Sequence, residues 1–244
     1  MATLIQLPPE FLFLVALAKF GTIILSIANY VTCNRRYRAT KSKVAFWFGI
    51  TFLLYAIATT ISLGNSVVFY VSRENFLVTY PYFTSGNAIL MTYATTALLH
   101  VSTLVFTDEK SWKPKILTWV HFGITTFLAV VSIFWSIFVS VTHNPVANGV
   151  AALTALTYLS LIVWGILLRR KMTRLENVSG VTEEGIGRLR AIVIGSAVML
   201  GATMVIIVDY LLMDPSFTGY TWLSPLGYLI MRIGIYQFRR AMAK

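Results

Sequence analysis

Charge and cysteine are scarce in this sequence of 244 residues. Only 12% of the residues are charged and 57% are hydrophobic, whereas soluble domains carry about 25% charged residues. Such a composition excludes a soluble fold of this size. The lone cysteine, Cys33, can form neither an internal disulfide nor a cysteine metal cluster. The apolar segments contain no HExxH motif, and Asp209 is the one carboxylate expected within the membrane, so the sequence predicts neither a metal site nor an enzyme.

Long apolar stretches make up most of the chain. A transmembrane helix needs about 20 predominantly apolar residues to cross a hydrocarbon core about 30 Å thick. Seven stretches meet this requirement: 10–32, 44–70, 84–106, 116–141, 147–168, 191–213 and 222–238. The remaining residues are too few for a separate catalytic or DNA-binding domain. We therefore predict one all-α membrane domain, residues 1–244, built as a seven-transmembrane-helix bundle.

The positive charge follows the alternation of these stretches. A net charge of +11 could indicate a nucleic-acid partner. However, seventeen Lys and Arg residues fall in the odd-numbered connections and at the C-terminus, and only Arg73 falls in an even-numbered connection. The positive-inside rule then predicts a multi-pass protein of the cell membrane with its N-terminus outside and its C-terminus in the cytoplasm. The basic residues face anionic lipid headgroups, and no nucleic-acid partner is expected.

The third and fourth stretches differ in polarity. Polar side chains at membrane depth face protein partners rather than lipid, so the third stretch should be the most enclosed. It carries Asn87, Thr92, Tyr93, Thr95, Thr96, His100, Ser102 and Thr103. The fourth should face lipid over much of its surface, because it carries Phe127, Phe134, Trp135 and Phe138. Close helix contacts are expected at the small residues Ala197, Gly201, Gly227 and Gly234.

Four segments together resemble the microbial rhodopsin family. They are Pro9-Glu10-Phe11-Leu12-Phe13-Leu14, the run 50–60 (ITFLLYAIATT), Thr95-Thr96-Ala97-Leu98-Leu99 and Met231-Arg232-Ile233-Gly234-Ile235. The likeness is spread over the whole chain and agrees in length, helix number, orientation and the outer connection between the second and third helices. It implies a seven-helix bundle and a homo-oligomer.

The photochemical residues of that family are replaced here. The resemblance places the retinal-binding lysine at Arg232, and a guanidinium stays protonated and is a poor nucleophile. It places carboxylates at Tyr228, Met91 and Ser102, and a ring-sandwiching tryptophan at Thr92. The expected protein therefore holds no covalent retinal and pumps no protons in light.

The cavity that retinal would fill must be closed or occupied. Thr92 and Ala202 stand where the resemblance implies larger side chains. We therefore expect a narrowed pocket that holds water or a non-covalent apolar ligand such as a lipid tail, retinal or a carotenoid. Its predicted lining is Met91, Thr95, Tyr158, Tyr228 and Arg232. Within it, Arg232 either anchors an anionic group or is a structural charge satisfied by neighbouring groups or by snorkelling.

Two other intramembrane charges and two histidines need assignment. Lys19 and Asp209 lie in the outer halves of the first and sixth stretches and are either partners or interfacial charges. A Schiff base on Lys19 is a minor alternative. His100 and His121 are at similar depths, which allows haem ligation but is more typical of packed, hydrogen-bonded histidines.

Three function classes follow from these observations. The favoured class is a non-photoactive opsin-like sensor, accessory or chaperone-like subunit that acts on a membrane protein partner. The second is a transporter or channel for a small anion or apolar ligand, using the polar third helix and Arg232. The third is a redox subunit with haem on His100 and His121.

Overall fold

The computed structural model describes residues 11–106, 113–139, 145–176, 183–212 and 221–242. Within these ranges the secondary structure is helical apart from short turns and caps. Seven long helices follow one another: α2 (Leu12–Thr40), α3 (Lys43–Val71), α4 (Arg73–Phe106), α5 (Lys113–Phe138), α6 (Pro145–Glu176), α7 (Glu183–Leu212) and α8 (Leu223–Met242). The predicted all-α class is confirmed for the described part of the chain, and each predicted apolar stretch lies largely in one helix.

Four of these helices contain segments long and apolar enough to cross a membrane. The segments are Leu12–Thr40, Lys43–Val71, Ile116–Trp135 and Ile186–Asp209, and α6 adds a shorter apolar segment, Ala152–Leu167. The chain is therefore a helical membrane protein. The other helices are more polar: α4 carries many hydroxyl groups, and α8 carries Arg232, Arg239 and Arg240.

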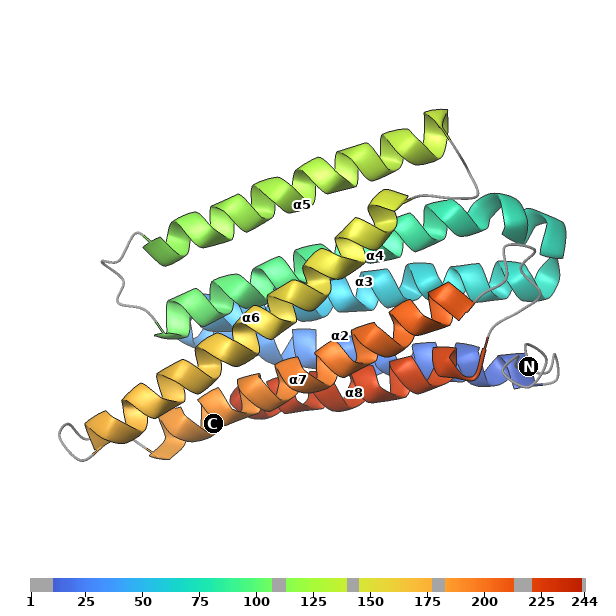
Figure 1. The fold of residues 1–244 in the computed structure, drawn as a ribbon. Coiled ribbons are helices and arrows are strands. Elements are labelled where there is room, and N and C mark those ends of the chain that lie inside the picture. The colour runs from blue at the N-terminus through green and yellow to red at the C-terminus, as the bar shows by residue number, and fades with distance from the viewer. Residues whose placement is uncertain (1–10, 107–112, 140–144, 177–182, 213–220, 243–244) are drawn as a thin grey trace.

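The helices form a ring with one member outside it (Figure 1). Along the chain α2 packs on α3, and α3 on α4; the ring continues through α6 and α7 to α8, which returns to α2. Helix α5 packs on α4 and α6 from outside. The first and last helices of the bundle are therefore neighbours, which allows residues from α2 and α8 to build one site.

Short connections fix the α2–α3–α4 segment. Helix α2 ends at Thr40; its C-cap residue Lys41 has a left-handed φ of 54°, and the Ser42 hydroxyl accepts a hydrogen bond from the Ala45 N–H at the start of α3. Only Ser72 separates α3 from α4. Residues 73–83, which the apolar stretches leave as a connection, are helical and belong to α4. Glu74 in the first turn favours this helix start electrostatically, and the ribbon of α4 bends near its N-terminal end (Figure 1).

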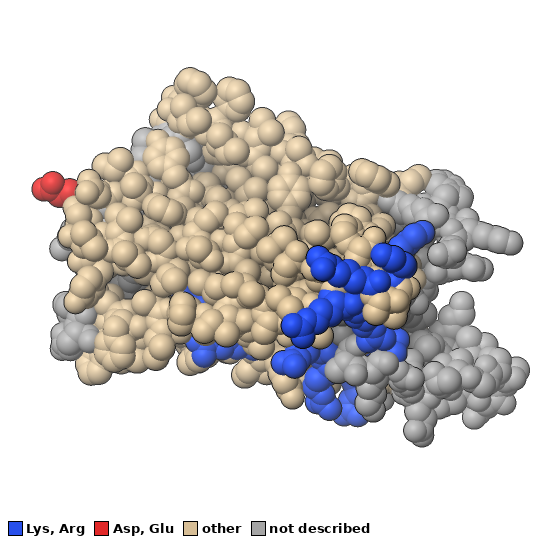
Figure 2. Space-filling model, turned by 180° about the vertical axis from the view of Figure 1, so that it is seen from behind, with Lys and Arg blue, Asp and Glu red and all other residues tan. Residues whose placement is uncertain are grey.

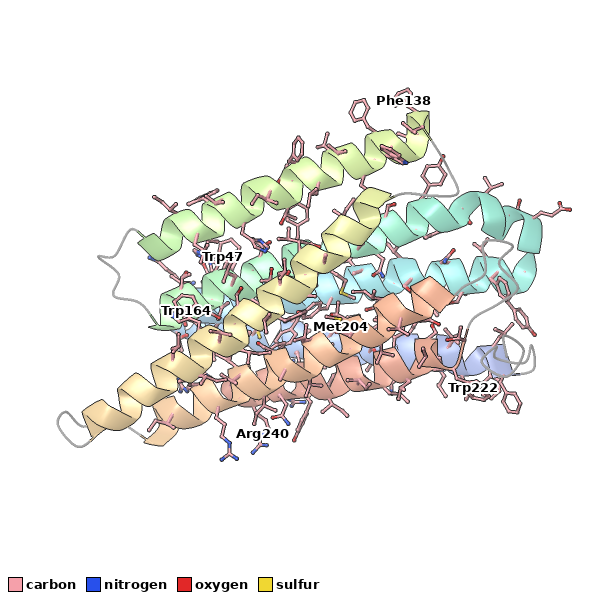
Figure 3. The ribbon with its side chains drawn as sticks, viewed as in Figure 1. Trp47, Phe138, Trp164, Met204, Trp222 and Arg240 are labelled. Atoms are coloured by element: carbon pink, nitrogen blue, oxygen red, sulfur yellow. The ribbon has the colours of Figure 1, made fainter. Side chains whose placement is uncertain are left out.

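The burial of α4 and α5 confirms the two polarity predictions. Residues 94–99 of α4 are buried without interruption, so this helix is enclosed on all sides there. By contrast, Trp119, Phe127 and Phe138 of α5 are 71%, 66% and 73% exposed. Figure 3 shows Phe138 at the end of α5, pointing away from the other helices. In lipid such exposure carries little cost, because the surrounding acyl chains are as apolar as the side chains.

Large side chains fill the interior between the ring helices. Phe52, Tyr55, Leu98, Tyr158 and Met231 are at most 2% exposed and belong to one cluster of buried side chains. These residues come from α3, α4, α6 and α8. Lipid acyl chains solvate apolar side chains about as well as the protein interior does. These five residues therefore stabilise the bundle mainly through close packing.

Glycines set the distance between α7 and α8. A Cβ at Gly195 would lie 2.6 Å from Phe238 Cε1, and one at Gly234 would lie 2.6 Å from Met199 Cγ. Gly227 also packs closely, against α7. The predictions for Gly227 and Gly234 are therefore confirmed.

The corresponding predictions for Ala197 and Gly201 on α7 are wrong. Both residues are exposed, and a Cβ at Gly201 would meet nothing within 4 Å. The close contact on α7 is made by Gly195 instead, because the rotation of α7 turns that residue toward α8. A small residue predicts a close helix contact only when it is also known which side of its helix faces the neighbouring helix.

Most of the described Lys and Arg residues gather at one end of the bundle (Figure 2). They include residues from the end of α2, the start of α3 and the end of α8, where Arg239 and Arg240 are exposed. Figure 3 shows Arg240 near one end of α8 and Trp222, which precedes this helix, near the other. Such a one-sided distribution accords with the charge pattern of the sequence, and the cytoplasmic assignment of the basic end stays a prediction.

Candidate functional site

A buried lysine lies at the centre of a polar cluster in the half of the bundle away from the basic end. Lys19 is 1% exposed and lies on the inward face of α2, in a row with Val15, Thr22 and Ser26. Its Nζ donates hydrogen bonds to the Ser62 carbonyl oxygen at 2.9 Å and to the Ser66 hydroxyl at 2.7 Å. The ammonium is thus held inside the protein by α3, rather than snorkelling to the surface.

Tyr228 brings α8 into the same cluster. Its hydroxyl lies 2.6 Å from the Ser62 hydroxyl, and its ring centroid lies 5.3 Å from Lys19 Nζ, within cation–π range. Asn87 on α4 lies close enough to the Tyr228 hydroxyl to interact with it electrostatically. The Thr22 hydroxyl reaches the Tyr228 carbonyl oxygen at 3.4 Å. Four helices therefore meet around this tyrosine.

Asp209 on α7 is a second buried charge near the start of α8. It is 5% exposed and accepts a hydrogen bond from the Thr221 hydroxyl. The same hydroxyl accepts the Leu223 N–H at 3.1 Å and so caps the start of α8. Because Lys19 and Asp209 are both buried, the interfacial alternative left open by the sequence is wrong. The two charges attract each other, and their direct pairing stays a prediction.

We call this group of residues the Lys19 cluster: Lys19, Ser62, Ser66, Asn87, Asp209, Thr221 and Tyr228. It joins α2, α3, α4, α7 and α8. In the described residues, the buried Oδ1 atom of Asn87 has no hydrogen-bond partner. An amide oxygen is an acceptor, so the cluster can accept a further hydrogen bond. Chemically the cluster places a buried amine beside two serines and a tyrosine in the interior of the bundle.

Arg232 lies outside this cluster, against the backbone of α2. Its Nη2 donates to the carbonyl oxygens of Leu17 at 2.9 Å and Ala18 at 2.6 Å, and its Nε lies 3.3 Å from the Thr22 hydroxyl. The residue is half-buried, in the groove between α2 and α8. The structure therefore does not bring Arg232 together with Tyr228, although the two residues are one turn apart.

The other predicted pocket residues form separate contacts between helices. The Tyr158 hydroxyl lies 2.5 Å from the Tyr55 hydroxyl, and the Thr92 and Thr154 hydroxyls are 2.8 Å apart. Thr95 bonds its own helix, with its hydroxyl 2.8 Å from the Thr92 carbonyl oxygen. Met91 packs at the edge of the main buried cluster. These residues link α3, α4 and α6 to one another, and Arg232 does not join them.

The two histidines have different surroundings. His121 Nδ1 lies 2.8 Å from the Thr96 hydroxyl, and its Nε2 lies 2.6 Å from the Thr157 hydroxyl. His100 packs its ring on Trp47, with centroids 4.7 Å apart. Because both nitrogens of His121 are engaged by hydroxyls, this geometry favours a packing role over haem ligation.

Three important residues were not anticipated from the sequence. Ser62 and Thr221 complete the Lys19 cluster, and Gly21 faces the guanidinium of Arg232. A signal for Ser62 was present, because it lies on the same helical face as Asn65 and Ser66. No protein-family model, curated protein or solved structure matches the chain.

Proposed function

We propose that this chain is a seven-transmembrane-helix protein of opsin-like architecture that acts by interaction, as a sensor, accessory or chaperone-like membrane subunit, without covalent retinal or light-driven pumping. The ring of six helices with α5 packed outside it, and the gathering of most basic residues at one end, support this topology. In this proposal the N-terminus lies outside and the C-terminus in the cytoplasm of a cell-membrane protein. The chain is not an enzyme.

The observation that carries the proposal is the position of Arg232. The resemblance assigns the retinal-binding lysine to this position, and here the guanidinium is engaged by the α2 backbone. A guanidinium cannot form a stable Schiff base with an aldehyde under ordinary conditions. The interior of the ring is filled by large side chains such as Phe52, Tyr55 and Tyr158. A protein with these properties has kept a membrane scaffold while lacking the means to hold a chromophore covalently.

Lys19 is the amine that could replace the missing lysine, and its environment argues against this role. Its Nζ is held by hydrogen bonds to the Ser62 carbonyl oxygen and the Ser66 hydroxyl, and the side chain is 1% exposed. A Schiff base requires an amine with room for an aldehyde beside it. The Lys19 cluster is better suited to sensing, since five helices contribute to it and a ligand or partner could change their relative positions.

A retinal reconstitution experiment tests the proposal. Purified protein is incubated with all-trans retinal, treated with borohydride and analysed by intact mass. We expect no retinyl adduct and no red-shifted absorption band. The Arg232→Lys variant should also give little stable pigment, because Tyr228 and Met91 provide no counter-ion. A stable wild-type adduct, or a band that hydroxylamine bleaches, would refute the proposal.

The same sample distinguishes the alternative classes. A haem spectrum that disappears in the His121→Ala variant would favour the redox subunit. Anion flux in liposomes that depends on Arg232 would favour the transporter. We expect neither signal, because His121 is engaged by two threonines and Arg232 lies between helices rather than in the ring interior.

A further inference from the structure

Arg232 is a half-buried cation that contacts an apolar helix segment. Helix α8 runs parallel to α2, with the Phe11 and Trp222 rings 5.8 Å apart at one end. With a rise of 1.5 Å per residue, Arg232 lies about 14 Å along α8 from its first residue. Its partner Ala18 lies about 9 Å from the first residue of α2, in a segment apolar enough to span a membrane. The guanidinium therefore lies against a candidate membrane span and away from the helix ends.

The hydrogen bonds of this guanidinium leave its charge uncompensated. The three groups that accept from it are the Leu17 and Ala18 carbonyls and the Thr22 hydroxyl, all of them neutral. The described carboxylate at membrane depth, Asp209, is bonded to Thr221 and attracts Lys19 instead. In the bilayer centre an arginine costs about 2.5–3.5 kcal/mol, and such residues normally pair with a partner.

We use the word groove for the line along which α2 and α8 pack beside Arg232. Both helices carry exposed apolar side chains within about one turn of the residues in this contact: Leu17, Phe20 and Ile24 on α2, and Leu229, Ile233 and Tyr236 on α8. Gly21 forms its floor, because a Cβ there would lie 2.8 Å from Arg232 Nη1. The glycine lets the guanidinium lie flat on α2, and the apolar borders give a neighbouring helix a surface to pack on.

We propose that this groove is the docking surface for a transmembrane helix of another protein that carries an aspartate or glutamate near its middle. This inference rests on the proposed function, since it identifies the partner of an accessory subunit. Charge complementarity selects the occupant: a carboxylate neutralises the guanidinium and accepts two parallel N–H bonds. The apolar borders then pack against the remainder of the partner helix.

Two other occupants fit the groove less well. A second copy of this chain would need a carboxylate at the same depth, and Asp209 is buried and already engaged. A lipid phosphate lies at the membrane interface and would have to descend about 9 Å to the level of Ala18. A partner helix places its carboxylate at the required depth without deforming the bilayer.

The test uses the full-length protein in phosphatidylcholine vesicles. Synthetic leucine-alanine transmembrane helices with a central Asp, Asn or Leu serve as probes, and binding is followed by energy transfer from a label on the protein's C-terminus. We expect the Asp helix to bind about tenfold more tightly than the Leu helix, the Asn helix falling between them. Arg232→Leu should abolish this preference, while Arg239→Leu, on the same helix, should keep it.

Gly21→Ala provides a milder second variant. It pushes the guanidinium off α2 without removing the charge, so the preference for Asp should change while the protein stays folded. The proposal fails if the Asp and Leu helices bind equally, or if the preference survives Arg232→Leu. Self-association of the protein that depends on Arg232 would assign the groove to a second copy of this chain. A loss of probe binding on addition of phosphatidylglycerol, if it depends on Arg232, would assign the groove to lipid. A retinal band in the same vesicles would instead refute the proposed function.

Discussion

Replacing Lys19 by methionine should strongly destabilise the bundle. Methionine keeps the length of the side chain but removes the ammonium and its hydrogen bonds to Ser62 and Ser66. It also removes a positive charge that attracts the buried Asp209. Leaving the buried acceptors of Lys19 without their partner costs about 1–3 kcal/mol. Since 1 kcal/mol shifts the Tm of a protein of this size by about 2–4 °C, we expect Tm to fall by about 2–12 °C.

A double-mutant cycle separates the charge interaction from the loss of packing. Asp209→Asn keeps an acceptor for the Thr221 hydroxyl and removes the negative charge. In the Lys19→Met/Asp209→Asn variant no unpaired charge remains, so the combined loss should be smaller than the sum of the single losses by about 1–3 kcal/mol. Lys43→Met, at an exposed position at the start of α3, is the matched control and should change stability by at most about 0.5 kcal/mol.

The assay is reversible unfolding of the purified protein in mixed micelles, with SDS as denaturant and helix content as readout. All variants share one detergent composition, so that the free energies of unfolding are comparable. A Lys19→Met variant as stable as wild type would refute the buried network. Additive losses in the double variant would show that Asp209 does not compensate the Lys19 charge.

Three further predictions concern packing and topology. Tyr55→Phe and Tyr158→Phe should each cost about 1 kcal/mol in unfolding free energy and the double variant scarcely more, because the two hydroxyls bond each other. Gly195→Val should cost about 1–3 kcal/mol or more, since α8 lies against it, whereas Gly201→Val should be almost neutral in the same unfolding assay. Externally added maleimide should label a cysteine placed at Asn75 and fail to label cysteines placed in 34–43, 107–115 and 169–190; the opposite pattern would reverse the proposed orientation.

Local patterns in the sequence predicted the helices and their general environment. Apolar length predicted the positions of the helices, because each helix satisfies its own backbone hydrogen bonds. Hydroxyl-rich and aromatic composition predicted that α4 is enclosed and that Phe127 and Phe138 of α5 are exposed. The extension of α4 back to Arg73 was missed, since a helix outside the membrane core needs no apolar sequence.

The arrangement of the candidate site depends on features that a single sequence does not encode locally. Tyr228 and Arg232 are four residues apart, so their Cβ atoms share a helical face to within about 40°. Their side chains nevertheless end in different places, because the missing Cβ of Gly21 opens a position on α2 for the long arginine. The pairing of Lys19 with Ser62 depends likewise on the rotation of α2 against α3.

The neighbouring positions of α2 and α8 have a consequence for biosynthesis. Lys19 meets Ser62 and Ser66 early, but Tyr228 follows it by more than 200 residues. At a synthesis rate of about 5–20 residues per second, this interval lasts about 10–40 s. During that time the Lys19 side of α2 has α3 beside it and lacks α7 and α8. Until the last helix is inserted, the nascent chain must keep this charged face close to the translocon or to an insertion factor.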